Sequence, residues 1–337
     1  MPAPPDALAP EPGRPMYVGR NVVLPEGRRF DWPASGVRVR FRGAVLRAVL
    51  DEHGHDEVEI RLDGAVHQAA VTLRRGENEL RVEAGPADVE HVVEIAKRTE
   101  AREGFFVVTS VSAEGGQLLP LAARPRLEVV GDSISTGFGI QPSRPDGTCS
   151  FVVREQNALA TYAAELARLH DLDASIVAVS SKTTREMTAF YERAWPAEEA
   201  PPYAFDDPKP AAVVVLLGTN DFFHRNPDKG TFVHDTLALV ARIRSHRGAD
   251  VPVLLGLSPM LSDAYPHGAR HRTLARRYFE AAIARARTRG DAAVHFLELA
   301  EPTPEQGWGC SAHPSTSTHH TMATTLSQFF DREHLLR

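Results

Sequence analysis

The sequence predicts an α/β fold in which an antiparallel β-sandwich precedes a parallel sheet flanked by helices. Short segments of alternating polar and apolar residues, separated by polar turns, occupy the first third of the chain. Continuous runs of valine, leucine and isoleucine alternate with helical patterns in the remainder. The length of 337 residues exceeds what one hydrophobic core usually needs, which favours two domains.

The pattern changes at residues 122–125, and this change divides the chain. Residues 1–16 are rich in proline and are expected to form a disordered lead. Residues 17–122 are expected to form the β-sandwich domain, and residues 123–337 the domain with the parallel sheet.

Alternation predicts the strands of the first domain. Successive side chains of a strand point to opposite faces, so each alternating segment presents one apolar face to a core. Turn sequences rich in glycine, aspartate and asparagine separate the segments, as in an antiparallel sandwich. The predicted strands lie within residues 37–43, 57–64, 69–76, 79–85 and 91–100.

The second domain shows strands and helices in turn. Apolar runs predict strands within residues 127–133, 176–181, 211–221, 251–259 and 292–299. Apolar residues at helical spacing predict helices over residues 158–172, 231–248, 271–290 and 316–334. A parallel sheet built in this way carries its sites just beyond the carboxyl ends of its strands. The residues that follow each run are therefore the candidates for chemistry.

Composition narrows the partners. The net charge is −6 and no basic stripe interleaved with aromatic residues occurs, so we expect no nucleic-acid partner. No apolar run is long enough to span a membrane, and none of the signals of secretion opens the sequence, so we expect a cytoplasmic location. Cys149 and Cys310 allow one disulfide, but two free thiols in a reducing compartment are favoured.

Three strand ends carry the candidate site. Ser133 closes a Gly-Asp-Ser sequence and is able to present its hydroxyl at the edge of the sheet. Asn220, in Gly-Thr-Asn-Asp, follows a middle strand and offers an amide donor to an oxyanion. His313 precedes the last helix and offers a base for the serine proton. Each residue alone fits a capping or surface role equally well, but the combination favours acyl transfer.

This order of motifs resembles the SGNH (GDSL-like) hydrolase superfamily. The resemblance implies an SGNH-type catalytic domain in which Ser133 is the nucleophile and His313 its base. It also implies an oxyanion hole formed by the amides of Ser133 and Ser181 and by the Asn220 side chain. Ser181 stands where the superfamily carries a glycine. No metal and no organic cofactor is implied.

The sequences WPASG (32–36), AKRTEAREG (96–104) and GCSAHPS (309–315) resemble carbohydrate esterase family 2. In that family a small jelly-roll domain precedes the SGNH domain, and its members remove acetyl groups from sugars. A related layout is known for a GDSL acyltransferase that acts on an aromatic polyketide antibiotic. The resemblance therefore implies an esterase that acts on an acylated sugar or small glycoside through an acyl-serine intermediate.

Two alternatives stay open. The acyl group could pass from acyl-CoA to a hydroxyl of a natural product, or the chain could be a carbohydrate-binding protein with a degenerate site. A further question concerns the group that orients His313, because the acid usual in the superfamily is replaced by Cys310 and Ser311. A backbone carbonyl, Glu305 and Ser311 are the alternatives, and the carbonyl, which gives a Ser–His dyad, is favoured.

Overall fold

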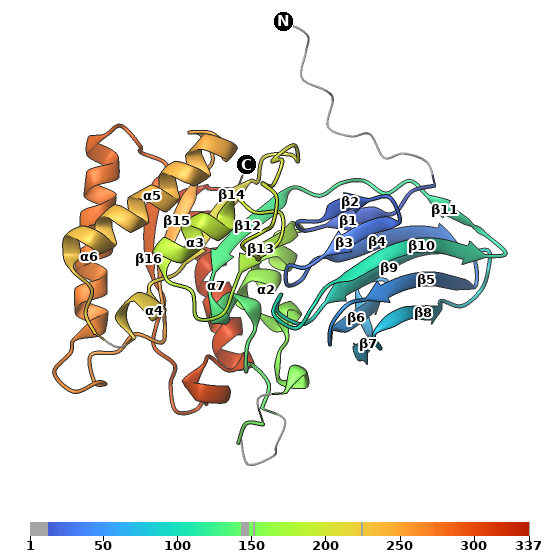
Figure 1. Cartoon of the computed structure of the whole chain (residues 1–337), viewed down its shortest axis with the longest axis horizontal. Coiled ribbons are helices and arrows are strands. Elements are labelled where there is room, and N and C mark those ends of the chain that lie inside the picture. Colours follow the sequence, from blue (N-terminus) through green and yellow to red (C-terminus); the bar gives the residue numbers. More distant parts are fainter. Residues whose placement is uncertain (1–12, 143–147, 151, 224, 337) are drawn as a thin grey trace, which may run out of the picture.

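A computed structural model describes residues 13–142, 148–150, 152–223 and 225–336. Figure 1 shows the antiparallel strands gathered at one end of the molecule and the parallel sheet with its helices at the other. The expected disordered lead, residues 1–16, falls mostly outside the described residues, and Met16 already begins the first strand. The predicted fold class is confirmed.

Two antiparallel sheets form the first unit. One has the order β1-β4-β9-β6-β7, with β11 paired to β4, and the other has the order β2-β3-β10-β5-β8. The strands of both sheets are β1 (Met16–Val18), β2 (Val22–Leu24), β3 (Gly27–Phe30), β4 (Gly36–Arg42), β5 (Val45–Glu52), β6 (Glu57–Leu62), β7 (Ala65–Thr72), β8 (Gly76–Glu83), β9 (Glu90–Lys97), β10 (Phe106–Glu114) and β11 (Gln117–Leu119).

Alternation in β4 shows how the sequence builds this unit. Val37, Val39 and Phe41 are buried in the core between the sheets, whereas Arg40 and Arg42 are exposed. The apolar face of the strand is thus removed from water, which is the main favourable contribution to packing.

A five-stranded parallel sheet with the order β13-β12-β14-β15-β16 forms the second unit. Its strands are β12 (Arg126–Gly131), β13 (Asp173–Ala178), β14 (Ala212–Leu216), β15 (Val253–Leu257) and β16 (Val294–Glu298). Its helices are α1 (Ser133–Thr136), α2 (Tyr162–Leu169), α3 (Thr184–Tyr191), α4 (Thr219–Phe222), α5 (Lys229–Arg247), α6 (His271–Thr288) and α7 (Thr316–Glu333). None of the helices that the structure describes is both long and apolar enough to cross a membrane.

Both faces of this sheet are covered. Val129 of β12 packs in the cluster that includes α2 and α7, and its neighbour Val130 packs in the cluster that includes α3, α5 and α6. Because successive side chains of a strand point to opposite faces, a strand covered on both sides needs apolar residues at every position. This requirement explains the apolar residues Leu127, Val129 and Val130, and the buried Glu128 between them is the exception.

Buried polar contacts join the two units. Glu128, in the middle of β12, is fully buried and accepts hydrogen bonds from Arg20 of the antiparallel unit (3.1 Å) and from Arg247 of α5 (2.9 and 3.0 Å). Trp32 Nε1 donates to the carbonyl of Ala194 at 2.8 Å. These contacts fix the antiparallel unit against the sheet that carries the candidate site.

Candidate active site

The turn after β12 presents Ser133. Asp132 caps α1 by accepting a hydrogen bond from the amide of Ile134 (3.1 Å). At Gly131 a Cβ atom would lie 2.0 Å from the Ser135 hydroxyl oxygen, so only glycine fits. The Ser133 side chain is thereby left partly exposed at the carboxyl edge of the sheet, where sites of such folds form.

His313 reaches this serine from the far end of the chain. Its Nε2 lies 2.7 Å from Ser133 Oγ, which is hydrogen-bond distance between a nucleophile and a base. Its Nδ1 lies 2.9 Å from the Cys310 carbonyl oxygen. A carbonyl only accepts, so Nδ1 carries the hydrogen and Nε2 is left as the acceptor for the Ser133 proton. This contact is the first of the three alternatives for the orienting group; Glu305 is exposed.

The loop over residues 309–313 is held at two points. The amide of Cys310 donates to the Gly139 carbonyl at 2.7 Å, and the amide of Gly309 donates to the His313 carbonyl at 2.8 Å.

Burial lowers the pKa of His313, because desolvation disfavours the charged imidazolium. The imidazole is therefore neutral near neutral pH, as a general base must be.

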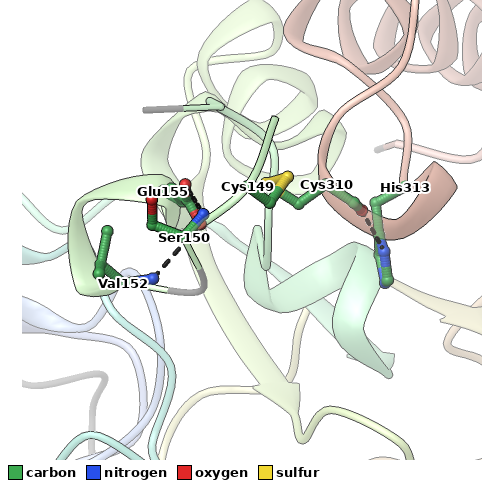
Figure 2. Close-up of a disulfide and its surroundings, with 6 residues drawn as sticks. All are labelled: Cys149, Ser150, Val152, Glu155, Cys310 and His313. Atoms are coloured by element: carbon green, nitrogen blue, oxygen red, sulfur yellow. Dashed lines mark hydrogen bonds between the residues drawn. A yellow bond between two sulfur atoms is a disulfide. The ribbon is translucent and has the colours of Figure 1, made fainter. Parts of the chain in front are cut away.

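The oxidation state of the two cysteines differs from the one expected from the sequence. Cys149 and Cys310 form a disulfide, so the prediction of two free thiols is wrong. The Cα atoms of the two residues lie 5.5 Å apart, within the usual span of a disulfide, although 161 residues separate them in sequence. Figure 2 shows that the bridged residue Cys310 is also the one whose carbonyl meets the His313 ring. Both sulfur atoms are consumed by the bridge and are not available as thiolate ligands beside Glu155.

Asn220 lies in α4, which begins after a glycine in the left-handed region (Gly218, φ 106°). Its Nδ2 donates to the Lys182 carbonyl at 3.0 Å and to Asp132 Oδ2 at 3.3 Å. Burial, with a further contribution from the nearby Asp221 carboxylate, raises the pKa of Asp132 to about 7. Asn220 is thus adjacent to the nucleophile turn, with both amide hydrogens engaged.

Ser181 follows β13 and adopts a φ of 66°, in the left-handed region that favours glycine. This conformation gives a physical reason for the glycine that the superfamily carries at this position. Its neighbours contact the other site elements: Ser180 Oγ lies 3.3 Å from Thr136 Oγ1 of α1, and Asn220 donates to Lys182. The structure therefore brings all four predicted site residues to one edge of the sheet.

Aromatic residues near the site divide into core and surface. Phe222 is fully buried against Phe232, whereas Phe223 and Trp308 are 63% and 50% exposed. Phe138 meets the His313 ring edge-on, with the ring centroids 5.1 Å apart. Sequence reasoning missed Phe138, since nothing about a phenylalanine five residues after the serine marks it as a neighbour of the base.

Comparisons with known proteins bear on this geometry. Residues 129–320 match the GDSL-like Lipase/Acylhydrolase family, and residues 17–121 match the Carbohydrate esterase 2 N-terminal family. The cellulase/esterase CelE of Acetivibrio thermocellus is 26% identical over 335 residues, which cover 96% of this chain and 40% of that protein. An acetylxylan esterase / glucomannan deacetylase of Cellvibrio japonicus is 26% identical over 241 residues, which cover 62% of this chain and 61% of that protein.

A solved structure shares the whole architecture. The family two carbohydrate esterase from Clostridium thermocellum, determined in complex with cellohexaose, is 25% identical with a TM-score of 0.87, covering 95% of this chain and 99% of that one. The chain spans less than two thirds of the length of the two curated relatives. The predicted resemblance to both families is confirmed. The chain belongs to the GDSL-like lipase/acylhydrolase family, and its first part is a carbohydrate esterase 2 N-terminal domain.

Proposed function

We propose that the protein is a serine-dependent carbohydrate esterase that removes acetyl groups from an acylated sugar or small glycoside. The observation that carries the proposal is the 2.7 Å contact between Ser133 Oγ and His313 Nε2, with the other ring nitrogen held by a carbonyl. The names of the relatives, an acetylxylan esterase among them, support the substrate class.

The first half-reaction forms an acyl-enzyme. Ser133 Oγ attacks the ester carbonyl carbon while His313 Nε2 takes the hydroxyl proton. The bond between the carbonyl carbon and the sugar oxygen then breaks, and the imidazolium returns the proton to that oxygen. The sugar leaves with a free hydroxyl and the acyl group stays on Ser133.

The second half-reaction restores the enzyme. His313 takes a proton from water, whose oxygen attacks the acyl carbon, and the bond to Ser133 Oγ breaks as the proton returns to it. Acetate is released. Neither half-reaction changes an oxidation state, so no redox partner takes part.

The oxyanion of both half-reactions is assigned to three donors: the amides of Ser133 and Ser181 and the side chain of Asn220. Asn220 already uses both amide hydrogens, and its longer contact, at 3.3 Å to Asp132, is the one we expect the oxyanion to replace. A preorganised donor of this kind is worth roughly 10²–10³ in kcat.

The Cys310 carbonyl takes the place of the carboxylate that usually completes a triad. It fixes the tautomer and the orientation of His313 through the same ring nitrogen. A carbonyl dipole stabilises the imidazolium less than a carboxylate does, so proton transfer depends more on the Ser133 contact and the oxyanion hole. The site is therefore proposed to act as a Ser–His dyad.

Hydrolysis of p-nitrophenyl acetate and of acetylated xylo-oligosaccharides tests the proposal. Ser133→Ala and His313→Ala are expected to abolish turnover, and mass spectrometry of the wild type is expected to show an acetyl adduct on Ser133. Ser245→Ala, which removes an exposed serine on α5, is the matched control and is expected to keep full activity. Turnover that persists in Ser133→Ala would refute the nucleophile.

The same assay separates the alternatives. Transfer from acyl-CoA predicts that the acyl-serine forms from the thioester and is released only when an alcohol acceptor is added. If the chain is a carbohydrate-binding protein, calorimetry is expected to detect sugar binding, and neither an adduct nor turnover is expected. No contact among the described residues favours a thioester donor, so acyl-CoA use stays a prediction.

A further inference from the structure

The segment that carries Ser181 is held from outside the catalytic unit. Ser180 directly precedes it, and all three polar groups of Ser180 are engaged. Its amide donates to Glu100 Oε2 at 3.3 Å, and its carbonyl accepts from the Arg102 guanidinium. Its hydroxyl lies 3.3 Å from Thr136 of the nucleophile helix. Two of these partners belong to the antiparallel unit, in the connection between β9 and β10.

Glu100 is built into this contact. The residue is 3% exposed, and its own amide donates to Gln156 Oε1 at 2.8 Å. Burial raises the pKa of Glu100, because desolvation disfavours the charged carboxylate. A buried carboxyl group is retained where its surroundings compensate for lost hydration, and here the hydrogen bond from Ser180 and the positive charge of Arg102 do so.

Ser181 needs such support because of its backbone. A φ of 66° lies in a region that L-residues disfavour. A serine keeps this conformation only where the surrounding structure holds it. The residues on both sides of Ser181 are held: the carbonyl of Ser180, in the peptide that carries the Ser181 amide, accepts from Arg102, and the carbonyl of Lys182 accepts from Asn220. The direction of the Ser181 amide therefore depends on both units of the molecule.

We propose that Glu100 and Arg102 are positioning residues for catalysis: they hold the Ser180 peptide so that the Ser181 amide points to the oxyanion. The inference rests on the proposed function, in which that amide is a donor. The antiparallel unit then contributes to the chemical step through the oxyanion hole, in addition to any role in binding sugar. Neither residue touches the substrate in this proposal.

The experiment measures kcat and KM for p-nitrophenyl acetate in Glu100→Ala, Arg102→Ala and the double variant. Loss of one oxyanion donor lowers kcat by roughly 10²–10³, so partial misplacement in the double variant is expected to lower kcat by at least about tenfold. KM is expected to stay within about twofold, because the interaction exists mainly in the transition state. Glu100→Gln keeps an acceptor for the Ser180 amide and is expected to retain most of kcat.

Arg38→Gln is the matched control. Arg38 of the antiparallel unit pairs with Asp173, the first residue of β13, whereas Arg102 bonds Ser180, just beyond the other end of that strand. Both contacts therefore join the same two units. Arg38→Gln is expected to lower the melting temperature and to leave kcat unchanged. An equal loss of kcat in Arg38→Gln and in the double variant would mean that docking of the units, and not the turn, matters, and would overturn the inference.

A rescue gives the second readout. Glycine adopts positive φ without strain, so Ser181→Gly in the double variant is expected to recover kcat by about threefold or more. A double variant that melts like wild type with unchanged kcat would overturn the inference. Failure of the proposed function has a different signature, since Ser133→Ala would then keep its turnover in the same assay.

Discussion

The disulfide between Cys149 and Cys310 is expected to stabilise both the fold and the base. It closes a loop of 161 residues, for which the chain-entropy model gives about 5 kcal/mol. Replacing both cysteines by serine is therefore expected to lower the free energy of unfolding by up to about 5 kcal/mol. The same change loosens the residue whose carbonyl bonds His313, a contact whose loss corresponds to about tenfold in kcat.

Urea unfolding and p-nitrophenyl acetate turnover, each with and without dithiothreitol, measure both effects. Reductant is expected to move the wild type toward the double serine variant and to leave that variant unchanged, which is the matched control. Thiol titration of the folded, unreduced protein is expected to find neither cysteine reactive. Two reactive thiols, or a stability difference below about 1 kcal/mol between wild type and variant, would refute the reasoning.

Three further predictions concern charge and the oxyanion. Glu128→Gln leaves the buried Arg20 and Arg247 without their shared carboxylate and is expected to cost about 3–5 kcal/mol in urea unfolding at pH 7; a loss below about 1 kcal/mol would contradict it. Burial alone would raise the pKa of Glu128, but the two arginines outweigh it and lower the pKa to about 2. The ionised Glu128 therefore stabilises the fold above pH 4.5, the ordinary pKa of a glutamate, and this stabilisation is lost as the pH falls toward 2. The difference in free energy of unfolding between wild type and Glu128→Gln is expected to shrink across that range. Because burial lowers the pKa of His313, the acid limb of the kcat/KM profile is expected below pH 6.5, and a midpoint above 6.5 would contradict the assignment. Asn220→Ala is expected to reduce kcat by roughly 10²–10³ with a smaller change in KM, and a change below about threefold would remove it from the oxyanion hole.

Sequence reasoning reached most of the second unit because its strands are mostly apolar. The strand predicted within 127–133 and the helix predicted over 271–290 correspond to β12 and α6. In contrast, β5 was missed because it is buried at nearly every position and shows no alternation. The helix α3 was missed because its buried positions are Thr184, Met187 and Tyr191, and two apolar residues do not establish a helical period.

The candidate site divides in the same way. Ser133 and Asn220 follow adjacent strands of one parallel sheet, so their proximity follows from the topology. The positive φ of Ser181 and the bridge between Cys149 and Cys310 depend on where distant loops meet, which spacing in sequence does not encode. The preference for free thiols relied on an expected compartment, and that expectation says nothing about the distance between two Cα atoms.

The buried carboxylate of Glu128 has a consequence for how the molecule unfolds. It belongs to the central sheet of one unit, yet one of its two arginine partners, Arg20, comes from the other. Separation of the units would remove Arg20 from Glu128 and leave Arg247 as its remaining arginine partner, so a state with one unit folded and the other unfolded is disfavoured. We therefore expect a single cooperative unfolding transition for the whole chain. A fragment that begins at residue 123 is expected to be less stable than the whole chain, because its Glu128 keeps Arg247 but loses Arg20.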